Sequence, residues 1–96
     1  MKEIPLMKLL LCRKCHDVFK LDYDIRSCKC EEVSGYYEEN GLMAYYSGEG
    51  AVPIGFANSS LVHAAVNQPE GGDRGRVFEA FIIPKKCDNF QKVDTV

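Results

Sequence analysis

Four of the five cysteines lie within nineteen residues, as two close pairs separated by twelve residues. The pairs are Cys12 with Cys15 and Cys28 with Cys30. Two thiols this close in sequence fit on one turn, and two such turns facing each other present four sulfurs to one metal ion. Tetrahedral coordination by four thiolates is typical of structural zinc. The spacing therefore predicts a structural Zn²⁺ site whose ligands are Cys12, Cys15, Cys28 and Cys30.

Other cysteine chemistries match part of this pattern. An iron site uses the same four thiolates and stays open as an alternative, although the single residue between Cys28 and Cys30 favours zinc. The run from Cys12 to His16 also spells the attachment motif of c-type haem, but haem would leave the second pair unused. A thioredoxin-like redox pair requires a βαβ context that the sequence lacks. We interpret the lone Cys87 as a packing residue at the end of a strand.

The charge of the chain is small but unevenly distributed. The 96 residues carry 12 Lys and Arg against 14 Asp and Glu, a formal net charge of −2. Residues 1–30 contribute +3 and residues 31–96 contribute −5. No stretch reaches the roughly 18 apolar residues that a membrane span needs, so we expect no membrane segment. Cysteine pairs acting as metal ligands favour a reducing, cytoplasmic compartment.

Short alternating and aromatic segments predict a β-rich chain. Residues 9–11 form an apolar strand that leads into the first cysteine pair. Apolar and polar residues alternate over 19–25, which predicts a hairpin that bends at 22–24 and returns the second pair to the first. Asn40-Gly41 between two tyrosine-rich runs predicts a second hairpin over 36–46 with a type I′ turn.

One helix and two further strands complete the expected elements. Residues 52–57 read as a strand, and a helix near 59–67 follows it. Three good capping residues open that helix, and Pro69 ends it; the capping residues are Asn58, Ser59 and Ser60. Residues 77–83 are apolar on both faces except for Glu79, so we expect them to form a central strand of the sheet.

Residues 9–30 resemble the zinc ribbon, a metal-stapled hairpin found in many proteins that handle nucleic acids and in others where it is only a scaffold. The whole chain is similar to small uncharacterised bacterial and phage zinc-ribbon proteins, through the Leu-Cys-Arg-Lys-Cys motif ending at Cys15 and through residues 55–61. The second resemblance implies no activity. We therefore expect an α+β fold: an N-terminal zinc ribbon continuing into a small antiparallel β-sheet with one short helix. Residues 1–96 would form a single domain, with the ribbon at 9–30 and a β-rich extension over 31–96.

We expect recognition rather than catalysis. No nucleophile, base and orienting residue occur in a recognisable set, so the sequence indicates no enzyme. The acidic, aromatic extension favours contact with another protein, as an adaptor or inhibitor module. Paired tyrosines across the predicted hairpin supply contact area with a polar tip. Tyr37 and Tyr45 are the candidates for its exposed positions.

A nucleic-acid-binding ribbon is the first alternative function. Arg13, Lys14 and Lys29 fall in the two cysteine turns, where basic side chains can reach phosphates. Exposed Tyr37 and Tyr45 would then stack on bases. The same three charges are explained equally well as partners of a zinc–thiolate unit, which carries a charge of −2.

A pocket for a small anionic ligand or nucleotide is the second alternative. Gly48-Glu49-Gly50 precedes a strand, and the predicted helix opens at Asn58, Ser59 and Ser60. Free N–H groups at a helix N-terminus attract anions, and serine hydroxyls add donors. The sequence has no Walker or dinucleotide-binding motif, so ordinary turn glycines and a helix cap are the simpler interpretation.

Overall fold

The computed structural model describes residues 7–96, which form eight strands and one short helix. The strands are β1 (Met7–Cys12), β2 (Val18–Lys20), β3 (Arg26–Ser27), β4 (Ser34–Tyr37), β5 (Ala44–Ser47), β6 (Ala51–Phe56), β7 (Ala80–Ile82) and β8 (Phe90–Lys92). The helix α1 spans Asn58–Val66, between β6 and β7. A mostly β chain with one helix agrees with the predicted α+β class.

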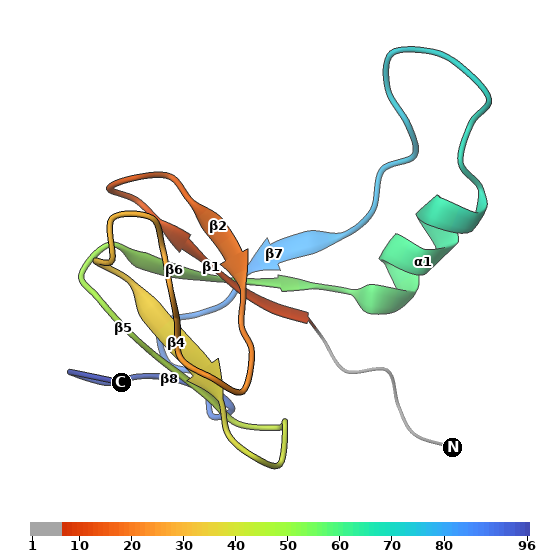
Figure 1. Cartoon of the computed structure of the whole chain (residues 1–96). Coiled ribbons are helices and arrows are strands. Elements are labelled where there is room, and N and C mark those ends of the chain that lie inside the picture. The colour runs from red at the N-terminus through yellow and green to blue at the C-terminus, as the bar shows by residue number, and fades with distance from the viewer. Residues whose placement is uncertain (1–6) are drawn as a thin grey trace.

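The strands form two four-stranded sheets rather than one (Figure 1). The first sheet has the order β2-β1-β6-β7, and all its neighbours are antiparallel. The second sheet has the order β3-β4-β5-β8, and β8 runs parallel to β5. The expectation of a single antiparallel sheet is therefore wrong. Residues 48–89 separate β5 from β8 and include β6, α1 and β7, and this long crossover allows β8 to pair in parallel with β5.

The inner faces of the two sheets pack into one hydrophobic core. Leu10 and Phe19 enter it from the first sheet, and Tyr46 and Phe90 from the second. Gly35 of β4 allows the two sheets to approach closely, because a Cβ there would lie 2.9 Å from Cδ1 of Leu10. The predicted ribbon segment and the extension therefore share a core instead of standing side by side.

Each cysteine pair lies in the turn of its own hairpin. β1 pairs with β2, and β3 pairs with β4, so the hairpin predicted over 19–25 is wrong. The apolar alternation there has another cause: Phe19 faces Leu10 across the β1–β2 ladder, and Leu21 is buried in the core. Residues 21–25 then cross from the first sheet to the second.

The hairpin predicted around Asn40-Gly41 is confirmed as the β4–β5 pair, with Tyr36 opposite Tyr45. Its turn is longer than the type I′ turn expected from the sequence. Only Gly41 has a positive φ, 72°. The Asn40 side chain instead accepts the backbone N–H groups of Leu42 and Met43, at 2.8 and 3.2 Å. This Asx-type contact replaces the second left-handed residue of a type I′ turn.

The predicted helix is confirmed as α1, but its cap is not. Ala57 occupies the N-cap, and no side chain caps the helix there. The Ser60 hydroxyl accepts the backbone N–H of Glu79 at 2.8 Å and so ties the helix to the segment before β7. Within residues 7–96, no helix is long and apolar enough to cross a membrane.

The expectation of a central strand over 77–83 is wrong. β7 has three residues and lies at the edge of the first sheet, next to β6 alone. Val77 and Ile82 are 83% and 63% exposed, whereas Ile83 reaches the core. An apolar segment normally marks a buried strand, but within residues 7–96 no strand pairs with the outer edge of β7.

Candidate metal centre

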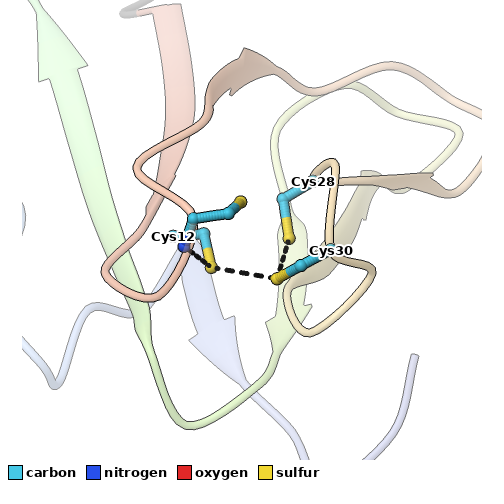
Figure 2. Close-up of side chains that lie close together, drawn as sticks. Cys12, Cys28 and Cys30 are labelled. Carbon is cyan, nitrogen blue, oxygen red and sulfur yellow. Dashed lines mark hydrogen bonds between the residues drawn. The ribbon is translucent and has the colours of Figure 1, made fainter.

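The four cysteines of the predicted site gather at one end of the two-layer fold. Cys12 ends β1 and Cys15 lies in the β1–β2 turn, which we call the first cysteine turn (residues 12–17). Cys28 and Cys30 lie in the β3–β4 turn, the second cysteine turn (residues 28–33). Figure 2 shows Cys12 facing Cys28 and Cys30 across the gap between these turns. A metal ion held here would join the first sheet to the second.

The sulfur positions fit a single tetrahedral metal ion. All four Sγ atoms lie within 4.8 Å of one another. The Sγ of Cys30 is 3.7 Å from that of Cys12 and 3.6 Å from that of Cys28. A tetrahedral ion with metal–sulfur bonds of about 2.3 Å places its sulfurs about 3.8 Å apart. A disulfide needs about 2.05 Å, so these contacts are those of ligands around a centre rather than of bonded pairs.

Backbone N–H groups point at the sulfurs and stabilise their charged form. The N–H of Val33 donates to Sγ of Cys28 at 3.3 Å, and the N–H of Cys15 donates to Sγ of Cys12 at 3.5 Å. The backbone N–H of Asp17, followed by that of Cys30, lowers the pKa of Cys15 to about 6. Burial raises the pKa of Cys28, but the Val33 N–H and the neighbouring thiols outweigh it and lower the pKa overall.

Cys30 has the opposite behaviour. The backbone N–H of Glu32 lowers its pKa, but burial and hydrogen bonds with the other three cysteines raise it to about 12. Four thiols this close cannot all lose their protons without a compensating charge. A divalent cation supplies that charge and displaces the protons, so metal binding at this cluster releases protons and weakens at low pH.

Both cysteine turns contain a left-handed residue directly after their second cysteine. His16 has φ 63° and Glu31 has φ 64°, and no other non-glycine residue in the described chain, 7–96, has a positive φ. The N–H of His16 donates to the Cys12 carbonyl at 2.7 Å, and that of Glu31 donates to the Cys28 carbonyl at 2.9 Å. These bonds close each turn, so the strained conformation positions the sulfurs.

Glycine at either left-handed position is expected to stabilise the protein. A left-handed conformation costs a non-glycine residue roughly 1–2 kcal/mol, and the extra flexibility of glycine in the unfolded chain offsets part of that gain. We expect His16→Gly and Glu31→Gly each to raise the unfolding free energy by about 0.5 kcal/mol and Tm by a few degrees, measured by thermal melts with saturating zinc. Lys29→Gly is the control, because Lys29 lies in the same turn as Glu31 but has no positive φ, and this variant should have a lower Tm. If both glycine variants melt below the wild type, strain at these positions is refuted.

The basic side chains of the turns lie among acidic ones. Lys14 forms an ion pair with Glu32 at 3.5 Å, and the guanidinium of Arg13 donates to the Glu49 carbonyl at 3.4 Å. The backbone N–H of Lys29 donates to a carboxylate oxygen of Asp17 at 3.0 Å. Three basic residues here face four acidic ones in or beside the turns: Asp17, Glu31, Glu32 and Glu49. Arg13, Lys14 and Lys29 remain candidate binding residues, but no excess of positive charge surrounds them.

The hairpin tyrosines divide between the two faces of the second sheet. Tyr46 is buried against Phe90. Tyr37 also packs against the core, its hydroxyl accepts the backbone N–H of Lys8 at 3.2 Å, and burial raises its pKa. Tyr36 and Tyr45 pair on the outer face with ring centroids 5.7 Å apart. The sequence alone could not show which tyrosine of each pair points outward, so it singled out Tyr37 where the outward residue is Tyr36.

Tyr45 holds a hydrogen bond that fixes the outer pair. Its hydroxyl donates to a carboxylate oxygen of Glu38 at 2.7 Å, and this bond raises the pKa of Tyr45. The ring therefore stays neutral and oriented across the sheet. Tyr45 is half-buried on the outer face of the second sheet, beside Tyr36.

The two segments of the predicted ligand pocket lie at opposite ends of β6. Six residues of strand place them about 20 Å apart. Gly50 accepts the backbone N–H of Arg13 at 2.9 Å, so the 48–50 loop packs against the cysteine turns. At the other end are the helix residues of the predicted pocket, Asn58, Ser59 and Ser60. The structure does not bring the glycine loop and the helix start together.

Comparisons with known proteins leave the site to be judged on its own geometry. No family model matches the sequence, and no curated protein or solved structure is significantly similar to it. The resemblance to the zinc ribbon and to bacterial or phage proteins therefore stays a prediction. The clustering of Cys12, Cys15, Cys28 and Cys30 is what the structure supports directly.

Proposed function

We propose that this chain is a small zinc-binding protein in which a structural zinc ion joins two β-sheets into a platform for binding another protein. The observation that carries the zinc site is the set of four sulfurs within 4.8 Å of one another. Four protein ligands fill a tetrahedral shell and leave no position for water or substrate. The metal is therefore structural, and recognition rather than catalysis falls to the surface that it stabilises.

The outer face of the second sheet has the chemistry of a protein-binding surface. Strand register places six side chains there, the tyrosine–serine face: Ser27, Ser34, Tyr36, Tyr45, Ser47 and Gln91. None of the six is charged. Tyrosine supplies large contact area at low entropic cost, and serine supplies adaptable hydrogen bonds, as in antibody paratopes. Such a face suits an adaptor or inhibitor that recognises a protein.

The same surface gives little support to nucleic acid as the partner. Binding to phosphates relies on clustered Lys and Arg side chains. The tyrosine–serine face has none, and the cysteine turns balance theirs with carboxylates. A protein partner is therefore preferred to the nucleic-acid alternative.

The test is capture of the partner on immobilised zinc-loaded protein from extracts of the native cells, followed by calorimetry with the purified partner. Removing Tyr36 and Tyr45 together, as Tyr36→Ala with Tyr45→Ala, is expected to weaken binding at least tenfold, because buried interface tyrosines commonly contribute 1 kcal/mol or more each. Tyr23→Ala removes a tyrosine that is 59% exposed elsewhere and is the matched control. Zinc content and Tm are checked for every variant.

Two results would count against the proposal. Wild-type affinity in the double variant would move the binding surface away from the tyrosine–serine face. Capture that disappears after nuclease treatment, with affinity falling steeply as salt is added, would support the nucleic-acid alternative.

A further inference from the structure

The outer face of the first sheet is apolar across all four strands. Leu9 lies opposite Ile54, and Ile54 opposite Ile82, on the side away from the core. The register gives eight residues on this side, which we call the apolar face: Leu9, Leu11, Val18, Val52, Ile54, Phe56, Ala80 and Ile82. Lys20, at the β2 edge, is the charged residue in the same register.

The inner side of the same sheet is mostly apolar as well, although it includes the buried Lys8. Leu10, Phe19 and Ile83 pack there in the core. Antiparallel sheets with one face in water normally alternate apolar and polar residues, and apolar residues on both faces are typical of sheets covered on both sides. The residues of the first sheet are therefore typical of a sheet that is covered on both faces, but only its inner face is covered.

Nothing in the described residues, 7–96, supplies the second cover. Val18 and Ile82, at the two edges of the apolar face, are 49% and 63% exposed. The single helix α1 lies beyond the end of β6 and away from the strands (Figure 1). Phe78 packs edge-on against Phe56, with ring centroids 5.3 Å apart, and extends the apolar face beyond the strands.

We propose that a second copy of this chain covers the apolar face, as a twofold dimer in which the two first sheets pack face to face. A mostly apolar surface with its one charged strand residue, Lys20, at the edge is complementary to another of the same kind, and a second copy presents the identical one. Lys20, at the β2 edge, is the charge that this packing has to accommodate, because alternation along the β7 segment points Glu79 to the other side of the sheet. A twofold axis along the strands places opposite edges of the two sheets over each other.

The size of the face suits a weak dimer. Two strands of six residues and two of three, about 4.8 Å apart with 3.3 Å per residue, cover roughly 290 Å² per copy. Side chains that stand above this plane, and Phe78 beyond its end, add to the contact area. The pair would bury at least about 600 Å², below the roughly 1,200–2,000 Å² of standard specific interfaces, so we expect a weak, concentration-dependent dimer. Homodimer interfaces are also more apolar than transient ones, as this face is.

The arrangement leaves the proposed partner-binding surface free. The apolar face and the tyrosine–serine face lie on the outer sides of different sheets. Aligned packing of the two first sheets about 10 Å apart therefore directs the two tyrosine–serine faces outward. A dimer would offer two copies of that face to a partner, with the gain in avidity that two linked sites give.

Sedimentation equilibrium of the zinc-loaded protein from 1 to 100 μM tests the proposal. The wild type is expected to approach twice the chain mass of 10.8 kDa as its concentration rises. Val18→Asp and Ile82→Asp each bury a carboxylate in the dimer and should weaken association at least 100-fold, while zinc content and Tm show that the monomer remains folded. Leu42→Asp, at a site 67% exposed in the β4–β5 hairpin, is the matched control and should remain dimeric.

Two outcomes would overturn the dimer. A wild type that is monomeric at 100 μM would show that a second copy does not cover the face, whether or not phosphatidylcholine vesicles or another protein bind there. Dimerisation of Val18→Asp and Ile82→Asp at wild-type affinity would place the interface elsewhere. Neither outcome bears on the zinc site, which metal analysis of the same samples reports independently.

Discussion

Chelation of the metal proposed at the cysteine cluster is expected to unfold the protein. The two cysteine turns belong to different sheets, and the four sulfurs join them within 4.8 Å. Structural zinc in small peptides contributes about 10–16 kcal/mol of binding free energy, comparable to the entire stability of a small domain, about 5–15 kcal/mol. Without the ion, the four close thiols have no positive charge between them, and no metal ion connects the ends of the two sheets. As a chelator is titrated in, far-UV circular dichroism should show loss of the folded signal. Thermal unfolding should cease to be cooperative as metal analysis shows the loss of one zinc per chain.

A single ligand substitution should have the same result. Cys28 is 3% exposed, and its sulfur accepts the Val33 N–H, so Cys28→Ser removes a ligand that the backbone was arranged to hold. We expect a loss on the order of 5 kcal/mol or more. Cys87→Ser is the matched control, because Cys87 lies outside the cluster and its thiol donates to the nearby side chain of Asn89. Native mass spectrometry gives the metal and its identity in each variant. A metal-free wild type that melts cooperatively at an unchanged Tm would show that metal binding does not stabilise the fold.

The cysteine cluster could be predicted from the sequence because the spacing within each cysteine pair is a local property. Two residues between Cys12 and Cys15, and one between Cys28 and Cys30, already confine each pair to one turn. Pairing of strands is not local. Alternation over 19–25 indicated extended chain, but the partner of Phe19 was decided by its fit against Leu10 in the β1–β2 ladder. Pattern alone could not distinguish a hairpin within the ribbon from two hairpins in different sheets.

The error at residues 77–83 has a different physical origin. Their composition is that of a strand with apolar neighbours on both sides, and the chain leaves Ile82 largely exposed at the edge of the first sheet. Sequence patterns report the environment in the functional assembly, whereas one chain shows only part of it. The same disagreement supports the proposal that a second copy covers the apolar face, where Ile82 would be buried.

The candidate binding residues show the same limit. Tyr36 and Tyr45 lie opposite each other in the β4–β5 pair, so their side chains share a face of the sheet. Which of the two faces meets the core depends on where Gly35 and Tyr46 pack, and this is a tertiary property. The glycines of 48–50 read correctly as turn glycines, but their contact with the cysteine turns could not be deduced from composition.

Gly48→Ala is expected to be the most damaging glycine substitution in the chain. Gly48 has φ 116°, a conformation that L residues rarely adopt. A Cβ there would overlap the carbonyl oxygen of Glu32 and lie 2.9 Å from Cα of Val33. Both neighbours are backbone of the second cysteine turn and cannot move without displacing the sulfurs. We expect a loss of roughly 3–5 kcal/mol in unfolding free energy, with weaker zinc binding, measured by denaturant unfolding and competition with a zinc chelator.

Two other glycines separate the causes of this loss. Gly72 also has a positive φ, 104°, but no atom lies within 4 Å of an added Cβ, so Gly72→Ala reports backbone strain alone. Gly71 has neither a positive φ nor a near neighbour, and Gly71→Ala should be nearly neutral. Because the loop around Gly72 is exposed and can relax, its loss should stay near 1 kcal/mol or below. If Gly48→Ala cost no more than Gly72→Ala and left zinc affinity unchanged, the 48–50 loop would not support the second cysteine turn. A larger cost accompanied by weaker zinc binding would show that the connection between the two sheets helps to shape the metal site.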